Sequence, residues 1–484
     1  MRLSLSEIAL ALNVAQPKEA EELVTGFTWD SREVKPGDLY VALPGERVDG
    51  HDFAAAAVSA GAVAVLGQRP VQVDAPVLVV DSTAQALVDL AAYWRGRLKG
   101  TVIGLTGSTG KTTTKNLVRD VLSAAGSVVA TIANQNNELG VPRTLLAADA
   151  DTGTVVVEMG MRGTGQIATL CAYAKPDWGL ITNVGESHIE LLGSRDAIAY
   201  AKDELFEALP DGRGIAFVNA ADDYAAELVR HARLRERGVS CVFFEGGNTF
   251  KHVDELGISQ DGAPFVWASD VFLDAEGRPM FLMHAERFES IGQPQANGVM
   301  RCMLELRGIH NVSNACSAAA VGLAAGMTLE QCCAALSASQ PEQGRQQLRR
   351  GEDGLTVLDD SYNANPDSMK ASLATFATMD VAGRRIAVLG DMLELGKFAK
   401  DAHEEVGYKA ASSNLDLLIC VGELGRYIAS AACRAGMPAD AVMTCSDAQA
   451  ALGLLAGKVE PQDAVLVKAS HSIGLEKVAE GLVG

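Results

Sequence analysis

The chain alternates short apolar runs with helical patterns over most of its length. In its middle part, β-branched runs at 101–106, 154–160, 178–185 and 214–219 are each followed by a loop and a helical pattern. Continuous apolar runs of this length are typical of parallel strands that are buried on both faces. The pattern therefore predicts a doubly wound parallel sheet with helices on both sides.

Similar runs occur on both flanks of this central part. Before it, apolar runs at 39–43, 62–67 and 77–80 precede a helical pattern at 86–98. After Pro341 and a polar stretch, strands restart in the segments LTVLDDS, RIAVLGDM, DLLICVGE and DAVLVKAS. We predict an α/β protein of three domains: a small α/β N-terminal domain (1–99), a central domain with a phosphate loop and the doubly wound sheet (100–337), and a Rossmann-like C-terminal βα domain (338–484).

Other segments depart from the strand–helix alternation. Residues 265–284 hold two strand-like runs around Asp-Ala-Glu-Gly, which predicts a β-hairpin, and the Ala-rich residues 314–326 predict a helix. The first residues, MRLSLSEIALALNV, carry Glu7 within an apolar run. They predict an amphipathic helix rather than a signal peptide.

Composition and charge narrow the functional class. The 484 residues exceed what one hydrophobic core usually serves, and a net charge of −20 argues against nucleic acid or an anionic membrane as main partner. The nine cysteines show no C-x-x-C spacing, which indicates reduced thiols and a cytoplasmic protein. Because no uncharged apolar run reaches about 18 residues, we expect no membrane insertion.

The stretch GSTGKTT at 107–113 follows one of the central strands and opens a helical pattern. Glycines let the backbone approach phosphate oxygens, Lys111 adds positive charge, and Thr112 takes the position whose hydroxyl usually binds Mg²⁺. Leu105 stands where the usual pattern has its first glycine, so the loop is a shortened form. We predict that nucleotide phosphates contact Gly107, Ser108, Thr109, Gly110, Lys111, Thr112 and Thr113.

Two further side chains follow neighbouring strands of the predicted sheet. Glu158 ends the strand TVVVE, and His188 comes shortly after WGLITNV. Because the carboxyl ends of parallel strands share one edge, both side chains are expected near Thr112. Carboxylate and hydroxyl oxygens suit Mg²⁺, whereas an imidazole is a less usual ligand, and a loop histidine that only packs remains an alternative.

Several segments together resemble the Mur ligase family, in all three predicted domains and in the same order. The segments are DSREVKPGDLYVALPGERVDGHDF (30–53), GSTGKTT (107–113), NQNNELGVPRT (134–144), TNVGESHIELLGS (182–194), AKDELF (201–206), HNVSNA (310–315), DDSYNANPDSM (359–369) and LGDMLELG (389–396). The last two are most similar to the family member that adds a dipeptide.

The resemblance implies an ATP-dependent and Mg²⁺-dependent ligase of cell wall peptidoglycan synthesis. Such an enzyme joins D-alanyl-D-alanine to a UDP-N-acetylmuramoyl-tripeptide through an acyl phosphate, and tripeptides ending in diaminopimelate or lysine both fit the motifs. The family leans towards monomers, so we expect a monomer.

The resemblance also assigns roles to individual residues. Lys111, Lys202 and His188 would be catalytic, and Thr112, Glu158, His188 and Lys202 would hold metal, with Lys202 carbamylated by CO₂. By residue type alone, Lys202 would instead be a solvated lysine paired with Glu204 or Glu207. The remaining residues would contact nucleotide (Asn311, Arg345 and Asp360) or the other substrates (Ser31, Arg32, Asn134, Asn137, Asn363 and Asn365).

One departure and three alternatives accompany this interpretation. Ala469 and His471 stand where relatives often have glycine and arginine, which puts a carboxylate-binding arginine in doubt. A sibling ligase that adds a single amino acid, a folate polyglutamate ligase and a non-catalytic nucleotide-binding scaffold are the alternatives. The Asp-Asn-Pro-Arg motif of one sibling does not occur, folate relatives lack the segment at 30–53, and the joint presence of Lys111, Glu158, His188 and Lys202 argues against a scaffold.

Overall fold

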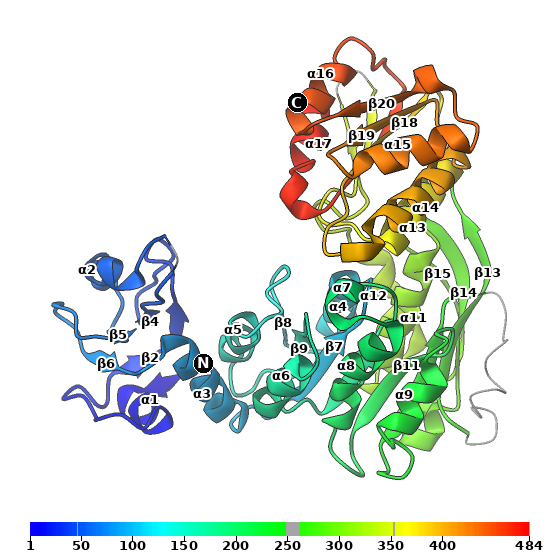
Figure 1. Cartoon of the computed structure of the whole chain (residues 1–484). Coiled ribbons are helices and arrows are strands. Elements are labelled where there is room, and N and C mark those ends of the chain that lie inside the picture. Colours follow the sequence, from blue (N-terminus) through cyan, green and yellow to red (C-terminus); the bar gives the residue numbers. More distant parts are fainter. Residues whose placement is uncertain (46, 248–261, 352–353, 484) are drawn as a thin grey trace.

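A computed structural model describes residues 1–45, 47–247, 262–351 and 354–483. Its three larger sheets fall in three successive parts of the chain, which we call the N-terminal, central and C-terminal domains. The N-terminal and C-terminal domains extend from the central domain in different directions (Figure 1). None of the helices in the described ranges is both long and apolar enough to cross a bilayer.

The N-terminal domain holds a parallel sheet of four short strands. Its strand order is β3-β4-β5-β6, and the predicted helix at 86–98 is observed a few residues earlier as α3. The first residues differ from the predicted helix, because Leu3–Ser4 pair as a strand with Leu23–Val24 and the helix begins only at Leu5. The elements are β1 (Leu3–Ser4), α1 (Leu5–Ala11), β2 (Leu23–Val24), β3 (Gly26–Thr28), β4 (Asp38–Val41), α2 (Ala54–Ser59), β5 (Ala64–Gly67), β6 (Val77–Val79) and α3 (Thr83–Arg95).

The central domain is built on a nine-stranded sheet of order β15-β14-β13-β12-β11-β10-β7-β9-β8. The strands from β8 to β13 are parallel, and β13, β14 and β15 pair antiparallel, which confirms the predicted hairpin around 274–277. The strands are β7 (Thr101–Thr106), β8 (Val128–Ala130), β9 (Thr154–Glu158), β10 (Trp178–Ile181), β11 (Ile215–Asn219), β12 (Ser240–Glu245), β13 (Phe265–Leu273), β14 (Pro279–Glu286) and β15 (Gly298–Met303).

Helices cover both faces of this sheet, as the pattern predicts. Successive residues of β9 enter different cores, since Val155 and Val157 pack in one and Val156 in the other. The first core also contains residues of α3, so the N-terminal and central domains share one continuous apolar core. The central helices are α4 (Lys111–Ser123), α5 (Gly140–Ala147), α6 (Gln166–Ala174), α7 (Ile189–Leu192), α8 (Arg195–Glu207), α9 (Ala225–His231), α11 (His310–Ala324) and α12 (Leu329–Ala338).

The C-terminal domain is a six-stranded sheet of order β16-β17-β21-β18-β19-β20, parallel except for the β16–β17 pair. It contacts the turn of the central hairpin, where Asp380 N–H donates to the carbonyl of Ala275 over 2.8 Å. The elements are β16 (Gln347–Arg350), β17 (Thr356–Asp359), α13 (Pro366–Thr378), β18 (Arg385–Gly390), α14 (Ala399–Ala411), β19 (Leu417–Val421), α15 (Gly425–Arg434), β20 (Val442–Cys445), α16 (Ala448–Leu455), β21 (Ala464–Lys468) and α17 (Glu476–Val483).

Candidate active site

The shortened phosphate loop joins the end of β7 to the start of α4, and its two glycines are required by space. A Cβ on Gly107 would lie 1.8 Å from Oγ1 of Thr182 on the neighbouring segment. Gly110 has φ of +75°, and a Cβ there would lie 2.8 Å from Oδ1 of Asn314. The loop therefore reaches the helix N-terminus in fewer residues because both positions lack a side chain.

Hydrogen bonds to the next strand segment hold this loop in place. Thr109 N–H donates to Oδ1 of Asn183 over 3.0 Å, and Gly185 N–H donates to Oγ of Ser108 over 2.8 Å. The Lys111 ammonium folds back onto the carbonyl of Gly107 at 2.7 Å. Removal from water lowers the pKa of Lys111, partly offset by Glu158. An anion bound in the loop would offer this ammonium a stronger partner than a carbonyl.

A cavity of about 1130 Å³ opens in front of the loop, between the central and C-terminal domains. This volume exceeds the roughly 300–1,000 Å³ of most single-ligand pockets, so it has room for a nucleotide and part of a second substrate. Most of the candidate residues line it: Ser108, Thr109, Gly110, Lys111, Thr112, Thr113, Asn134, Asn137, Glu158, His188, Asn311, Arg345, Asp360, Asn363 and Asn365.

Glu158 carries a buried oxygen without a hydrogen-bond partner, and the buried Nδ1 of His188 lies 3.1 Å from a carboxylate oxygen of Glu394. Oε1 of Glu158 accepts from the side chains of Thr112 (3.4 Å) and Asn136 (2.8 Å), whereas its Oε2 has no partner. Removal from water, with Lys111 and Lys202 nearby, lowers the pKa of His188 to about 4, so the imidazole is neutral at pH 7.

Buried polar atoms are normally satisfied, so the unpartnered Oε2 of Glu158 fits a bound cation. Within the described part of the chain, no group of three or more His, Cys, Asp or Glu side chains is placed to hold a metal ion. Mg²⁺ held by Thr112, Glu158 and His188 would therefore need phosphate oxygens or water to complete its coordination.

Lys202 lies on α8 with 1% of its surface exposed, so the interpretation as a solvated lysine is wrong. Glu204, the expected partner, instead accepts from the backbone N–H groups of Gly165 and Ala168 near the start of α6. Burial, reinforced by the charge of Lys111, places the pKa of the Lys202 amine well below its usual value. Both effects disfavour the charged form of the amine, and the neutral form is the one that reacts with CO₂.

The asparagine-rich loop after β8 lies at the cavity edge, and its members differ in what they do. Asn137 accepts from Leu139 N–H and Gly140 N–H, so it supports the start of α5. Asn134 lines the cavity. Asn136, which the sequence reasoning missed, donates to Glu158; its position between two candidate asparagines in NQNNELG was the available signal.

The segment after Pro341 brings an arginine to the phosphate loop. Nη2 of Arg345 donates to Oγ1 of Thr112 over 3.1 Å, and its guanidinium carbon lies 4.1 Å from the centre of the Tyr362 ring. Across the cavity, Asn311 is buried and donates to the carbonyl of Arg307 over 2.6 Å. Glu352 and Asp353 of the same polar segment lie outside the described residues.

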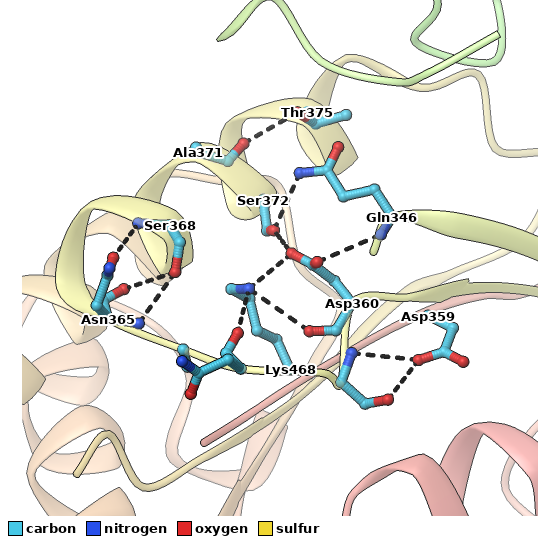
Figure 2. A network of polar contacts seen from close by, with 12 residues as sticks. Gln346, Asp359, Asp360, Asn365, Ser368, Ala371, Ser372, Thr375 and Lys468 are labelled. Carbon is cyan, nitrogen blue, oxygen red and sulfur yellow. Dashed lines mark hydrogen bonds and ion pairs between the residues drawn. The ribbon is translucent and has the colours of Figure 1, made fainter. Parts of the chain in front are cut away.

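Asp360 is surrounded by partners from its own domain (Figure 2). Its carboxylate lies 2.8 Å from Nζ of Lys468, accepts from Gln346 N–H over 3.2 Å and contacts the hydroxyl of Ser372. Lys468 also donates to the carbonyl of Asn363 over 2.8 Å. The sequence reasoning missed Lys468, whose position at the end of a buried parallel strand was the available signal.

The two asparagines of NANP occupy different positions. Asn363 lines the cavity, where its backbone carbonyl is held by Lys468. Asn365 is the N-cap of α13: its Oδ1 accepts from Ser368 N–H over 2.8 Å, while its Nδ2 donates to Oγ of Ser187 over 2.9 Å. Asn365 thus has a structural role, and it also ties the C-terminal domain to the loop before His188.

Ser31 and Arg32 lie in the N-terminal domain, away from the residues that line the cavity. The Arg32 side chain is 86% exposed and pairs with Asp30 at 2.6 Å. The neighbouring Glu33 lies 3.6 Å from Arg143 of α5, and Arg143 also donates to Gln135 in the asparagine-rich loop. A long substrate lying along Arg143 would therefore connect this region to the cavity.

The two residues that depart from relatives take ordinary places. Ala469 is fully buried, with its Cβ against Gly390, and fits without a cavity. The ring of His471 lies 5.7 Å from that of Tyr362, next to the stack with Arg345.

Comparisons with known proteins agree with this arrangement. Three family models match the chain: "Mur ligase family, catalytic domain" at 23–95, "Mur ligase middle domain" at 105–322 and "Mur ligase, glutamate ligase domain" at 344–471. The UDP-N-acetylmuramoyl-tripeptide–D-alanyl-D-alanine ligase of Mycobacterium leprae is 38% identical, covering 98% of this chain and 96% of its own.

Solved structures are similar over comparable lengths. The MurF structure from Acinetobacter baumannii covers 100% of this chain and 99% of its own, with a TM-score of 0.82 and 30% identity. The MurF ligase of Thermotoga maritima in complex with ADP covers 94% and 96%, with a TM-score of 0.74 and 28% identity. Given three matching models and such identity along nearly the whole length, the chain belongs to the Mur ligase family.

Proposed function

We propose that this protein is an ATP-dependent ligase that joins D-alanyl-D-alanine to a UDP-N-acetylmuramoyl-tripeptide in peptidoglycan precursor synthesis, forming ADP and phosphate. The observation that carries the proposal is the single cavity in which the phosphate loop meets the DDSYNANPDSM segment of the C-terminal domain. The names of the M. leprae and A. baumannii relatives support the same reaction.

The reaction makes an amide from a carboxylate and an amine. The γ-phosphoryl group of ATP passes to the tripeptide carboxylate, the dipeptide amine attacks the carbonyl carbon of the resulting acyl phosphate, and phosphate leaves with the electrons of the C–O bond. The protein must neutralise phosphate charge and keep water from the acyl phosphate. The cavity meets the second demand because the C-terminal domain forms one of its walls.

The phosphate loop supplies most of the charge neutralisation. Lys111 and the backbone N–H groups of 110–113 would hold the phosphates, and Arg345 lies 3.1 Å from Thr112 at the same place. Bound Mg²⁺ would neutralise charge on phosphate oxygens, with Thr112, Glu158 and His188 as its protein ligands. The unpartnered Oε2 of Glu158 supports this assignment.

Lys202 is proposed to act as a carbamate. Its neutral amine would add to CO₂ and release one proton, which converts a buried neutral group into an anion. That anion would face the positive charge of Lys111. In the unmodified protein, the same charge adds to the effect of burial and lowers the pKa of the Lys202 amine. The carbamate would then be a ligand of a second Mg²⁺.

The substrates are proposed to span the domains. Asn311 and Arg345 would face the nucleoside part of ATP, Asp360 would fix the wall beneath it, and Asn363 and Asn365 would face the dipeptide. Ser31 and Arg32 would hold the UDP end of the muramoyl substrate, with Asn134 and Asn137 nearer its tripeptide. We further propose domain limits of 1–99, 100–337 and 338–484, and a monomer that acts in the cytoplasm.

Phosphate release tests the proposal against its nearest alternative. The assay uses ATP, Mg²⁺ and UDP-N-acetylmuramoyl-tripeptide, and compares D-Ala-D-Ala with D-alanine, D-glutamate and diaminopimelate. We expect sustained release only with D-Ala-D-Ala. Release with a single amino acid and the shorter muramoyl substrate would instead identify a sibling ligase, and no release with any combination would favour a scaffold.

A further inference from the structure

The segment LGDMLELG, so far without a role, carries a carboxylate into the cavity from the C-terminal domain. It follows β18, and Glu394 within it has φ of +61°, in the left-handed region that non-glycine residues rarely adopt. Hydrogen bonds hold the preceding residues: Met392 N–H donates to Nε2 of His403 over 2.9 Å, and Leu393 N–H donates to Oγ of Ser470 over 3.0 Å. Leu395 is buried on the other side, so the position of Glu394 is fixed from both sides.

The Glu394 side chain reaches the central domain. Its Oε2 lies 3.1 Å from Nδ1 of His188. Its Oε1 lies 3.4 Å from Nη2 of Arg162, whose side chain is 71% exposed. Both contacts join partly exposed groups across the two domains, so an incoming cation can replace them at small cost.

The other carboxylates that the C-terminal domain brings to this cavity are paired with residues other than His188. Asp360 is held by Lys468, Glu342 accepts from Asn116 over 3.1 Å, and Asp367 pairs with Lys370 on its own helix at 3.5 Å. Among the described cavity-lining residues of that domain, Glu394 is the carboxylate that lies next to His188. It is thus an anion at the phosphate end of the cavity.

The second substrate needs an anion at this place. D-Ala-D-Ala enters with an ammonium group, and this nitrogen must reach the acyl phosphate, which forms where the γ-phosphate was held. Lys111 and Arg345 line that end of the cavity and repel an ammonium, while Glu158, another carboxylate there, already accepts from Thr112 and Asn136. A carboxylate from the domain proposed to bind the dipeptide would offset this repulsion.

We propose that Glu394 binds the ammonium group of the incoming dipeptide beside the acyl phosphate, and that the nitrogen attacks once this ammonium has released one proton to water. The proposal rests on the ligase function proposed above and adds the residue that recognises the amine. In the free protein, His188 and Arg162 take the place of the ammonium. Glu394 is then the group that distinguishes an amine from a neutral nucleophile of the same shape.

The test uses the full-length enzyme and compares two compounds. D-Ala-D-Ala is the substrate, and D-lactyl-D-alanine, in which a hydroxyl replaces the amino group, is the inhibitor. In Glu394→Gln we expect KM for D-Ala-D-Ala to rise at least ~10-fold, because a charge-assisted hydrogen bond is lost. The inhibition constant of the hydroxyl analogue and the KM values for ATP and the muramoyl substrate should change less than about twofold. Glu405→Gln, which removes an exposed carboxylate outside the cavity, should change none of these constants.

Other outcomes overturn the proposal. If D-Ala-D-Ala and the hydroxyl analogue both bind more weakly by the same factor, Glu394 only supports the site. An increased KM for ATP would mean that Glu394 positions His188. Unchanged constants would mean that Glu394 binds neither substrate. Acyl phosphate formation is measured separately, by hydroxylamine trapping without dipeptide. If the wild-type enzyme traps no acyl phosphate, the ligase function itself fails; if both enzymes trap it equally, the comparison of dipeptides decides on Glu394 alone.

Discussion

Replacing Lys468 by methionine should destabilise the C-terminal domain strongly. The change keeps most of the side-chain volume but removes the ammonium that contacts the Asp360 carboxylate at 2.8 Å and the Asn363 carbonyl at 2.8 Å. Lys468 is 2% exposed and Asp360 8%, so little water can replace the lost partner.

The expected magnitude follows from this burial. Removing one partner of a buried ion pair usually costs about 3–5 kcal/mol. Because every ~1.4 kcal/mol is a factor of ten, the equilibrium for opening the domain should shift at least ~100-fold. In Lys370→Met, which removes an exposed lysine paired at 3.3 Å with Glu405, the change should stay below ~1 kcal/mol.

Hydrogen exchange measures this effect without assuming that three domains unfold together. The amides of β17 and β21 report the free energy of opening the C-terminal sheet, and the double variant Asp360→Asn/Lys468→Met reports the coupling. The double variant should lose less than the sum of the two single variants. A loss below ~1 kcal/mol in Lys468→Met, or simple additivity, would refute the reasoning from a buried pair.

The other predictions concern the substrates. Asn363→Ala should raise KM for D-Ala-D-Ala more than KM for ATP. Asn365→Ala should do the same and should also lower the free energy of unfolding by about 1 kcal/mol, because it removes the cap of α13. Weakened ATP binding alone would contradict both predictions. Lys202→Ala should lose nearly all activity and regain part of it with short-chain carboxylates, and full activity without them would contradict a carbamate. A non-hydrolysable ATP analogue bound together with the muramoyl substrate should lower the radius of gyration in small-angle scattering. Arg32 lies outside the residues that line the cavity, so a substrate bound by both should draw the domains together. An unchanged radius would contradict this domain closure.

Four strands of the central sheet, β7, β9, β10 and β11, were predictable because their apolar runs are continuous and end at glycine or polar residues. The start of the chain was not, since Leu3 pairs with Val24 only through a strand contact that no local pattern records. The Ala-rich helix likewise begins earlier than predicted, at His310.

The candidate site was predictable where a residue type coincides with a strand end, as for Glu158, or with a helix start after a glycine loop, as for Lys111. The structural role of Asn365 and the burial of Lys202 depend on neighbours brought together by tertiary packing. Lys468 and Glu394 were missed for the same reason: their partners Asp360 and His188 are distant in the chain.

One isotope measurement tests the proposed reaction most directly. UDP-N-acetylmuramoyl-tripeptide labelled with ¹⁸O in its terminal carboxylate is incubated with ATP, Mg²⁺, D-Ala-D-Ala and the enzyme, and the products are examined by mass spectrometry. An acyl phosphate predicts the pentapeptide product together with ADP and phosphate that carries one ¹⁸O atom per amide formed. Unlabelled phosphate, AMP with diphosphate, or ATP hydrolysis without the pentapeptide would contradict the account.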